Sequence, residues 1–458
     1  MNTILIPEIR ATLARGDARA IREFAEDLHP ATIAEFVGDM EPSDLAAFLQ
    51  CLPPLDRGEV FSYLEVATQI RLAQSLKRDQ LAELVTHMSP DERADLVKRL
   101  KEETLEALWP ALAQAERDDI RRLAGYEEGT AGAAMTSDYV TLLPHLTARE
   151  AIEKIRREAP DRETVYYTYV LGPERTLVGS VSLKDLILAR PDSVVEALMV
   201  PGPIAVRVDE DQEAVARTIE KYDLLAVPVV DRDNSLVGIV THDDAFDILR
   251  EEQTEDLERL MGITGETREE SYLDVPSPVH YRKRVTWCVA LAALQLVSGW
   301  ILHTFQGALT SLMLLVVYLP MLASVGGNTG SQASTTVIRA LALGEVEASD
   351  ALRILWKELR VSILLGLTLG SLVYGKVYFF TGAGDVPPGF HLGWIGATVA
   401  LALGLQVVTS TAFGAVLPLA AARLRLDPAV VASPALSTVV DITGLLLYFG
   451  LATWLLQL

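Results

Sequence analysis

A single aspartate, Asp441, interrupts an apolar stretch near the end of the chain, in the run PALSTVVDITGLLLYFGLATWLLQL. An ionised side chain inside a membrane-spanning helix costs at least ~2.5 kcal/mol, so it usually faces the interior of a helix bundle or an aqueous path. We therefore interpret Asp441 as a cation site. The alternative is an aspartate that is protonated or hydrogen-bonded and only holds helices together.

Further oxygen-bearing side chains precede Asp441. Ser433, Ser437 and Asp441 follow one another at four-residue steps, which places them along one side of a helix. Asp427 lies 14 residues before Asp441. At about 1.5 Å per residue this separation is ~21 Å, which predicts that Asp427 lies near the cytoplasmic mouth of the path.

A second polar stretch, YLPMLASVGGNTGSQASTTVIRAL, lies in the middle of another apolar segment. Its Pro320, Gly326, Gly327 and Asn328 are poor choices for a helix that faces lipid. Irregular backbone at membrane depth is tolerated only where it is buried in protein or lines water. We therefore expect the helix to break here, and the stretch to line a pore or a helix interface.

The residue types indicate a hard cation. The apolar segments contain no Cys, Met or His cluster, whereas carboxylate, amide and hydroxyl oxygens are present. One aspartate per chain is too few for a dehydrated calcium site, but Mg²⁺ keeps several waters and is commonly held by one or two carboxylates. A symmetric dimer would supply two.

Five hydrophobic segments must position these groups: about 285–305, 310–335, 355–380, 391–420 and 431–457. Each is long enough for the ~20 residues that span a bilayer. Lys and Arg residues precede the first segment and lie in the loops after the second and fourth, so these loops are expected to be cytoplasmic. The prediction is a multi-pass protein of the cytoplasmic (inner) membrane, with its N-terminus in the cytoplasm and its C-terminus outside. The fourth segment adds Gln406, Thr409, Ser410 and Thr411, for which interhelical hydrogen bonding is the simpler explanation.

The negative charge is confined to the N-terminal part. From Val285 onward there are seven acidic and seven basic residues, so the net charge of −22 falls on residues 1–284. Such a surface repels nucleic acid and attracts cations. Two cysteines and an N-terminus without a signal-peptide pattern favour a cytoplasmic location for this part.

The first ~130 residues predict an acidic helical domain. Units of roughly 12 residues recur from His29 to about Leu100, and several of them open with proline, which is favoured at the first position of a helix. Short helices joined by tight turns stack into a small α-solenoid.

Residues 131–262 contain an α/β module twice. The segment Val170–Arg190 aligns with Val229–Leu249, 59 residues further on, and both hold Gly-x-x-Ser/Thr-x-x-Asp after a β-type run. This resembles a tandem pair of CBS domains, 131–200 and 201–262, whose clefts often receive adenine nucleotides. The resemblance implies that the signature hydroxyl and carboxylate, here Ser182 and Asp185, hold ribose and phosphate; the alternative is a pair with empty clefts that serves as a hinge.

An acidic helix is predicted after the second module, with Asp244, Asp247 and Glu255 among the acids on one face. Like charges at this spacing destabilise a helix, so a bound cation would relieve them. With Glu213 and Asp223 nearby in the sequence, we interpret this region as a divalent-cation sensor. A solvated acidic helix is the simpler alternative.

Together these features resemble the MgtE family of magnesium channels and transporters, most specifically in LPMLASVGGNTGSQASTTVIRAL and DPAVVASPALSTVVDITGLLLYF. The resemblance covers nearly the whole chain and implies a homodimer with its pore on the two-fold axis, in which Asp441 holds hydrated Mg²⁺ and Asp427 lies nearer the cytoplasm. A connecting helix or linker would span 263–284. Some members bind ATP between the CBS domains, for which Lys184 and Asp185 are the matching residues. The sensor acids that it implies are Asp91, Asp95, Glu213, Asp223, Asp244, Asp247, Glu252, Glu255 and Asp256.

The expected function is Mg²⁺ uptake down the electrochemical gradient, closed by cytosolic Mg²⁺ bound to the acidic domains. No Ser/His/Asp, Cys/His or metal-hydrolase spacing and no phosphate-binding loop occurs, so we expect neither an enzyme nor an ATP-driven pump. Two alternatives stay open: a transporter of other divalent cations such as Co²⁺ or Mn²⁺, and a membrane-bound nucleotide or metal sensor that conducts nothing.

Overall fold

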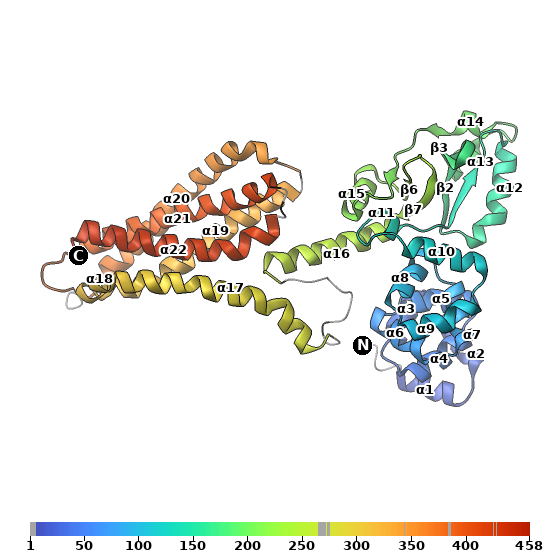
Figure 1. Ribbon diagram of the computed structural model, residues 1–458, viewed down its shortest axis with the longest axis horizontal. Coiled ribbons are helices and arrows are strands. Elements are labelled where there is room, and N and C mark those ends of the chain that lie inside the picture. Colours follow the sequence, from blue (N-terminus) through green and yellow to red (C-terminus); the bar gives the residue numbers. More distant parts are fainter. Residues whose placement is uncertain are drawn as a thin grey trace. The chain divides into compact units, whose positions relative to one another are not determined.

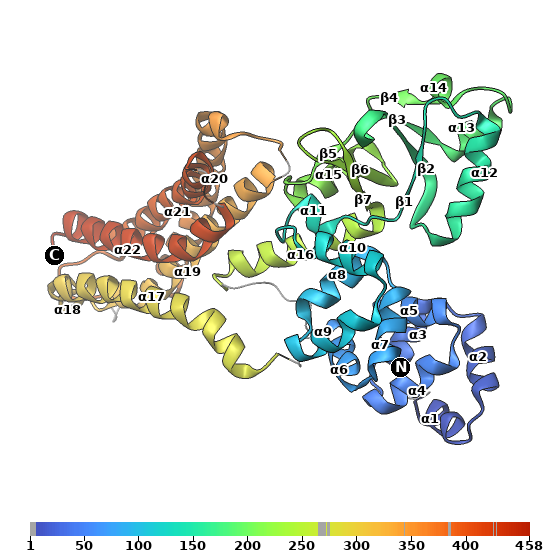
Figure 2. The same ribbon diagram turned by 45° about the vertical axis from the view of Figure 1, so that its right-hand side comes forward.

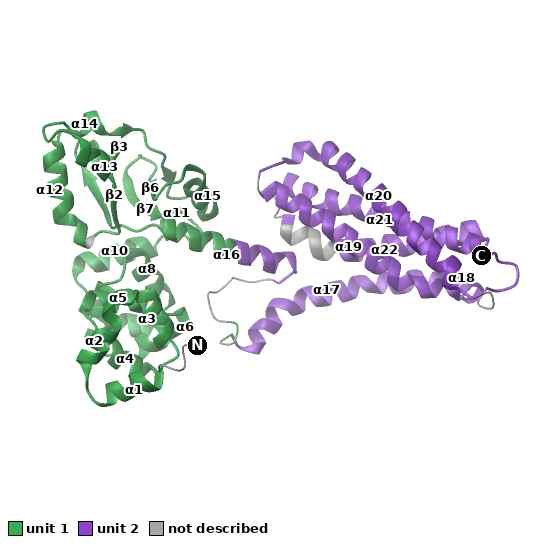
Figure 3. Cartoon of the chain, turned by 180° about the vertical axis from the view of Figure 1, so that it is seen from behind, with its two compact units in different colours: residues 1–252, 268–275 green, residues 253–267, 276–458 purple. Residues whose placement is uncertain are grey.

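The computed structural model describes residues 6–263, 272, 275–342, 344–382, 386–424, 426 and 428–458, without the side chains of 161 and 429–435. The chain divides into two compact units, one built mainly from residues up to Glu252 and one mainly from Pro276 onward (Figure 3). We describe each unit by itself.

The first unit begins with a stack of short helices. Helices two apart in the sequence pack together, for example α3 with α5 and α4 with α6, around a common apolar core (Figure 1). Four of them start at the prolines of the repeat, which confirms the predicted solenoid. The helices are α1 Ile6–Ala14, α2 Ala18–Glu26, α3 Pro30–Val37, α4 Pro42–Cys51, α5 Pro54–Ser62, α6 Val66–Ser75, α7 Arg78–Thr86, α8 Pro90–Arg99, α9 Glu102–Leu108, a 3-10 turn Trp109–Ala111, and α10 Gln114–Ala124.

The first α/β module follows the stack. Its sheet has the order β1-β2-β3-β4, with β1 parallel to β2 and the other pairs antiparallel, and α12 and α13 lie against it (Figure 2). Its elements are β1 Tyr139–Leu142, α12 Ala148–Glu158, a 3-10 turn Ala159–Asp161, β2 Thr164–Leu171, a 3-10 turn Pro173–Arg175, β3 Leu177–Ser182, α13 Leu183–Leu188, α14 Val195–Leu198 and β4 Val200–Pro201.

The second module repeats this arrangement with the order β5-β6-β7, and side chains from both sheets form a shared core. Its elements are β5 Val206–Arg207, α15 Gln212–Tyr222, β6 Ala226–Val230, β7 Leu236–Thr241 and α16 His242–Leu260. The short helix α11 (Ala131–Ala134) precedes the first module in sequence but packs into the core of the second. The second module therefore includes a segment that precedes the first module in the sequence, which a division at residue 200 does not capture.

The solenoid packs directly onto the second module. Ala94 of α8 and Leu123 of α10 are buried in the same core as Val215 and Val240. Because of this contact, the acidic N-terminal turn of α8 lies near the first turn of α16.

The second unit contains five helices that are long and apolar enough to cross a membrane, among the residues that the structure describes. Helix α21 is central and packs on α19, α20 and α22, while α17 packs on α22. The bounds are α17 Ser277–Thr304, a short α18 Gln306–Ser311, α19 Leu314–Ala342, a 3-10 turn Ala348–Asp350, α20 Ala351–Phe380, α21 Leu392–Arg423 and α22 Pro428–Leu456.

The predicted break in the second apolar segment is wrong, because α19 is helical from Leu314 to Ala342 with Pro320 inside it. Gly326 and Gly330 are instead needed for close packing, since a Cβ at Gly330 would lie 2.7 Å from the Ser410 hydroxyl of α21. Of the predicted connecting segment 263–284, residues 277–284 are the first turns of α17, and 264–271, 273 and 274 lie outside the described residues.

Candidate functional site

Asp441 is the 14th of the 29 residues of α22, which places it about 20 Å from either end of that helix. Its side chain is half-buried, and its Oδ2 accepts a hydrogen bond of 2.7 Å from Gln295 Nε2 of α17. A carboxylate thus lies at the middle of one apolar helix, in contact with an amide from another.

The other predicted pore residues differ in their surroundings. Pro320, Asn328 and Ser437 are exposed, and a Cβ built at Gly327 meets open space. Gly326 is buried against α21, so it belongs to a helix contact, the second possibility that the sequence left open. Asp427 and the side chain of Ser433 lie outside the described residues.

Helix α21 supplies polar contacts in the core of this unit. Gln406 Nε2 donates to the carbonyl oxygen of Val440 at 2.9 Å, and the Ser410 hydroxyl donates to the carbonyl of Gly326. Thr409 bonds carbonyls of its own helix. The interhelical explanation therefore holds for Gln406 and Ser410.

In the first unit, a group of carboxylates gathers where the solenoid meets the two modules; we call it the acid cluster. Its members are Asp91 and Glu92 in the first turn of α8, Glu163 just before β2, and Asp243 and Asp244 in the first turn of α16. Asp91 Oδ1 is fully enclosed and has no hydrogen-bond partner among the described residues. The Thr241 hydroxyl donates to Asp244 Oδ2 at 2.5 Å.

The electrostatics of the acid cluster are unfavourable when no cation is bound. Burial, followed by the negative charges of Asp244 and Glu92, raises the pKa of Asp91 well above its usual value. Burial also raises the pKa of Asp244 to about 6 and, with the charges of Asp244 and Asp243, that of Glu163 to about 7, although part of the Glu163 side chain is open to solvent. Such shifts, caused by desolvation and like charges in one place, are typical of functional sites.

The structure places the remaining sensor candidates elsewhere. Asp95 pairs with Lys98, and Glu213 pairs with Arg217. Glu252 accepts a hydrogen bond from Gln212 at 2.9 Å, and Glu255 pairs with Arg259. The others are exposed: Asp223 at the end of α15, and Asp247 and Asp256 on α16.

Of the predicted sensor acids, only Asp91 and Asp244 therefore lie in the acid cluster. Across the described part of the chain, no three His, Cys, Asp or Glu side chains lie close enough together to hold a metal ion. The donors of the acid cluster still suit a hard cation, because they are carboxylates and one of their buried oxygens has no hydrogen-bond partner among the residues that the structure describes. These carboxylates would bind either an ion that keeps most of its water ligands or an ion whose binding brings the carboxylates closer together.

Sequence reasoning missed Glu92, Glu163 and Asp243. Glu92 and Asp243 are neighbours of predicted residues, so the acidic pairs Asp91-Glu92 and Asp243-Asp244 were an available signal. Glu163 lies on a connection between two elements and joins the cluster only through the tertiary fold, so no pattern could have indicated it.

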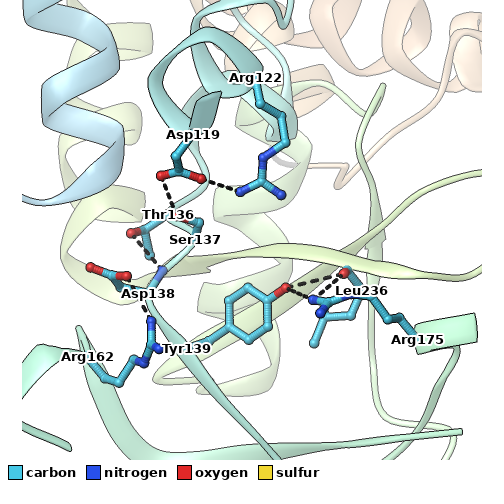
Figure 4. A network of polar contacts seen from close by, with 9 residues as sticks. All are labelled: Asp119, Arg122, Thr136, Ser137, Asp138, Tyr139, Arg162, Arg175 and Leu236. Atoms are coloured by element: carbon cyan, nitrogen blue, oxygen red, sulfur yellow. Dashed lines mark hydrogen bonds and ion pairs between the residues drawn. The ribbon is translucent and has the colours of Figure 1, made fainter. Parts of the chain in front are cut away.

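A polar network links the solenoid to the modules (Figure 4). Asp119 of α10 accepts a hydrogen bond from Ser137 at 2.9 Å, and Arg162 donates to Asp138 at 3.0 Å. Burial raises the pKa of Asp138, while the charge of Arg162 opposes the shift. Every carboxylate drawn in this network has a partner, which distinguishes it from the acid cluster.

The repeated signature has a local structural role in both modules. Ser182 caps α13, accepting from the amide of Asp185 at 3.0 Å and donating to its carboxylate at 2.5 Å. Lys184 and Asp185 are exposed. The residues proposed to hold a nucleotide therefore lie together at one helix N-terminus and are accessible.

Three family models match successive parts of the chain. The model described as the intracellular N domain of MgtE matches residues 28–129, the CBS domain model matches 131–192 and 195–251, and the MgtE model, described as a divalent cation transporter, matches 319–451. The order of these matches agrees with the architecture seen in the structure.

Two similar proteins are called magnesium transporter MgtE. The one from Thermus thermophilus is 36% identical over 100% of both chains, and the one from Bacillus subtilis is 32% identical over 98% of this chain and 97% of its own. Among solved structures, the soluble part of a magnesium transporter matches 55% of this chain and 99% of its own at 31% identity with a TM-score of 0.52. The cytosolic domain of the Mg²⁺ channel MgtE in complex with ATP matches 52% of this chain and 98% of its own at 37% identity with a TM-score of 0.50.

Proposed function

The chain belongs to the MgtE family, and on this basis we propose that it carries Mg²⁺ across the cytoplasmic membrane into the cell, down the electrochemical gradient. The observation that carries the proposal is Asp441, a carboxylate at the middle of α22. A hydrated Mg²⁺ needs only one or two carboxylates, because it keeps several of its own waters.

The membrane potential supplies the energy for uptake. A potential of 100 mV is worth ~2.3 kcal/mol per elementary charge, hence ~4.6 kcal/mol for a divalent ion. Inward flux therefore needs no ATP hydrolysis. The basic residues Arg282, Lys283 and Arg284 at the start of α17 support a cytoplasmic N-terminus, and with five spans the C-terminus would then lie outside.

We infer that the active form is a homodimer. Gln295 is exposed and Asp441 half-exposed in the single chain, and polar groups at mid-membrane depth are costly against lipid. A second copy across this face would cover them and would bring two Asp441 side chains to one path. Light scattering of the detergent-solubilised protein tests this, and a monomer that transports would contradict it.

Transport is tested by Mg²⁺ uptake into proteoliposomes under an imposed negative-inside potential, with internal Mg²⁺ kept low. The wild type is compared with Asp441→Asn, which removes the charge at constant volume, and with Glu358→Gln as a control that alters another carboxylate of the membrane unit. We expect uptake by the wild type and the control and its loss in Asp441→Asn.

The same assay separates the rival functions. Competition by Co²⁺ and Mn²⁺ at concentrations equal to that of Mg²⁺ would indicate a broader divalent-cation transporter. A folded wild type that takes up no cation would favour a sensor that conducts nothing.

We also propose that cytosolic Mg²⁺ closes the path by binding at the acid cluster. At low Mg²⁺ the carboxylates of α8 and α16 repel one another, and a bound ion would remove this repulsion and favour the packed arrangement. An ion shifts such an equilibrium only by its differential affinity for the two states. The enclosed Oδ1 of Asp91, which has no hydrogen-bond partner in the described part of the chain, supports this assignment.

The test of this second proposal measures how internal Mg²⁺ inhibits flux. The double variant Asp91→Asn with Asp244→Asn should need a higher internal concentration for half-inhibition, whereas Glu103→Gln, an exposed acid of α9, should not. Inhibition at the wild-type concentration in the double variant would count against a sensor at this place.

ATP is a further proposed ligand, because one similar cytosolic domain was solved in complex with ATP. Ser182, Lys184 and Asp185 would hold it at the N-terminus of α13. Titration calorimetry with ATP should give weaker binding for Lys184→Ala than for the wild type, and equal binding would place the nucleotide elsewhere.

A further inference from the structure

The hydrogen bond between Gln295 and Asp441 joins the first and last spanning helices across 146 residues of sequence. Gln295 is the 19th of the 28 residues of α17 and is flanked by Leu294 and Leu296, which are 48% and 74% exposed. An amide among leucines at this depth is costly unless it bonds a partner. Its partner is the one carboxylate that lies at mid-helix in this unit within the described residues.

The backbone beside Asp441 is held from a second direction. Gln406 is only 1% exposed, and its Nε2 donates to the carbonyl of Val440, the residue before Asp441. A Cβ at Gly326 or Gly444 would lie 2.5 or 2.4 Å from this nitrogen, so both glycines are needed for Gln406 to reach α22. The backbone of α22 is thereby fixed at position 440, and the remaining freedom of Asp441 lies in its side-chain torsions.

We propose that Gln295 is a positioning residue for transport: its amide holds Asp441 Oδ2 and leaves Oδ1 directed at the waters of the passing cation. The proposal rests on the proposed function of Asp441. A neutral amide suits this role better than Lys or Arg, because it restrains the carboxylate without cancelling the charge that attracts the cation. The helix α17 thus contributes to the ion path although it packs only at the edge of the unit.

The proposal makes a quantitative distinction between positioning and helix association. Loss of a positioning bond lets the carboxylate adopt other rotamers, so the cation binds less well while the helices stay packed. We therefore expect the half-saturating Mg²⁺ concentration to rise about three- to tenfold, with maximal flux within about twofold of the wild type. Loss of a bond that only joins helices would lower the melting temperature and the amount of active protein instead.

The variants are chosen to keep the volume of the side chain. Gln295→Met has nearly the same shape but lacks the donor, and Gln295→Glu replaces the donor by a second carboxylate. Ser298→Ala, one turn further along α17, is the matched control, because the buried Ser298 hydroxyl has no hydrogen-bond partner among the described residues. Each is assayed as the full-length protein, for uptake against Mg²⁺ concentration in proteoliposomes and for melting temperature in detergent.

The expected result is a raised half-saturating concentration for Gln295→Met with an unchanged melting temperature, and a lowered half-saturating concentration with slower maximal flux for Gln295→Glu. The positioning role would be overturned if Gln295→Met kept the half-saturating Mg²⁺ concentration of the wild type, or if only its maximal flux and melting temperature fell. In either case, loss of flux in Asp441→Asn would still support the proposed transport. Absence of saturable uptake by the wild type would overturn both proposals.

Discussion

Replacing Asp244 by asparagine should stabilise the first unit in the absence of metal at neutral pH and should weaken its response to Mg²⁺. Asparagine keeps a side-chain oxygen that can accept the hydrogen bond from the Thr241 hydroxyl, so this contact at the start of α16 is retained. The change removes one negative charge from the acid cluster. Any effect on stability therefore reports the repulsion and desolvation of that carboxylate.

The magnitude follows from the pKa of Asp244. Burial, with the charge of Asp243, raises this pKa from 3.8 to about 6, against the opposing hydrogen bond from Thr241. A difference of about two pKa units corresponds to ~3 kcal/mol, and solvent screening of the partly exposed group reduces this to about 1–2 kcal/mol. Because the pKa of Asp244 is higher in the folded than in the unfolded state, protonation of Asp244 stabilises the fold. This contribution is fully present below about pH 4 and is lost as the pH rises through 6.

The assay is urea unfolding of residues 1–263, since solved structures of relatives consist of the corresponding soluble part. In the presence of EDTA, the free energy of unfolding should fall between pH 4.5 and 7.5 by about 1–2 kcal/mol more in the wild type than in Asp244→Asn. Added Mg²⁺ at pH 7.5 should restore the wild type, because a ligand of the folded state stabilises it by RT ln(1 + [L]/Kd), and should stabilise the variant less. Glu103→Gln should behave as the wild type. Equal pH slopes, or equal stabilisation by Mg²⁺ in Asp244→Asn and wild type, would refute the reasoning.

Two further substitutions test the packing and the polar network. Gly414→Leu should prevent α19 and α21 from packing, because even a Cβ at this position would clash with a backbone oxygen of α19, and the variant should not elute as a monodisperse protein on size-exclusion chromatography. Gly450→Ala is the control and should be tolerated, because a Cβ there meets open space. Equal elution of the two variants would contradict the close contact at Gly414. Arg162→Met should lower the free energy of unfolding by about 1–3 kcal/mol, because it leaves Asp138 without its ion pair, whereas Arg156→Met, from an exposed pair, should cost less than about 1 kcal/mol. Similar urea midpoints for these two variants would show that the network does not stabilise the unit.

Much of the fold could be predicted because its signals are local. Proline at the first helical position marks the start of α3, α4, α5 and α8, and the 59-residue offset relates β3 to β7. The five spans are evident from hydropathy alone, but their ends are not: α17 begins at Ser277, eight residues before the predicted segment, and α19 ends at Ala342, seven residues after it. The packing of α11 into the second module could not be predicted, because α11 lies next to the first module in the sequence and reaches the second only through the tertiary fold.

The break expected at Gly326 failed for a physical reason. Glycine lowers intrinsic helix propensity by about 1 kcal/mol, but in a membrane the backbone must satisfy its own hydrogen bonds, so the helix persists. What the glycines supply is closeness: the Ser410 hydroxyl reaches the Gly326 carbonyl, and Gln406 reaches past Gly326 to α22. The glycine-rich composition indicated that this stretch does not face lipid, and only its contacts with the neighbouring helix show that it forms a close helix interface.

Four aspartates show why residue type and spacing identify an ion site only in part. Asp185 bonds the Ser182 hydroxyl at a helix start, and Asp138 is held by Arg162. Asp91 has an enclosed oxygen without a partner among the described residues, and Asp441 is held by a neutral amide that leaves its charge uncompensated. A negative charge that is shielded from water and has no cationic partner is unfavourable, so such a carboxylate either takes up a proton or binds a cation from solution. By this criterion Asp91 and Asp441 are the sites to test for Mg²⁺, whereas Asp138 and Asp185, which already have partners, are expected to stabilise the fold.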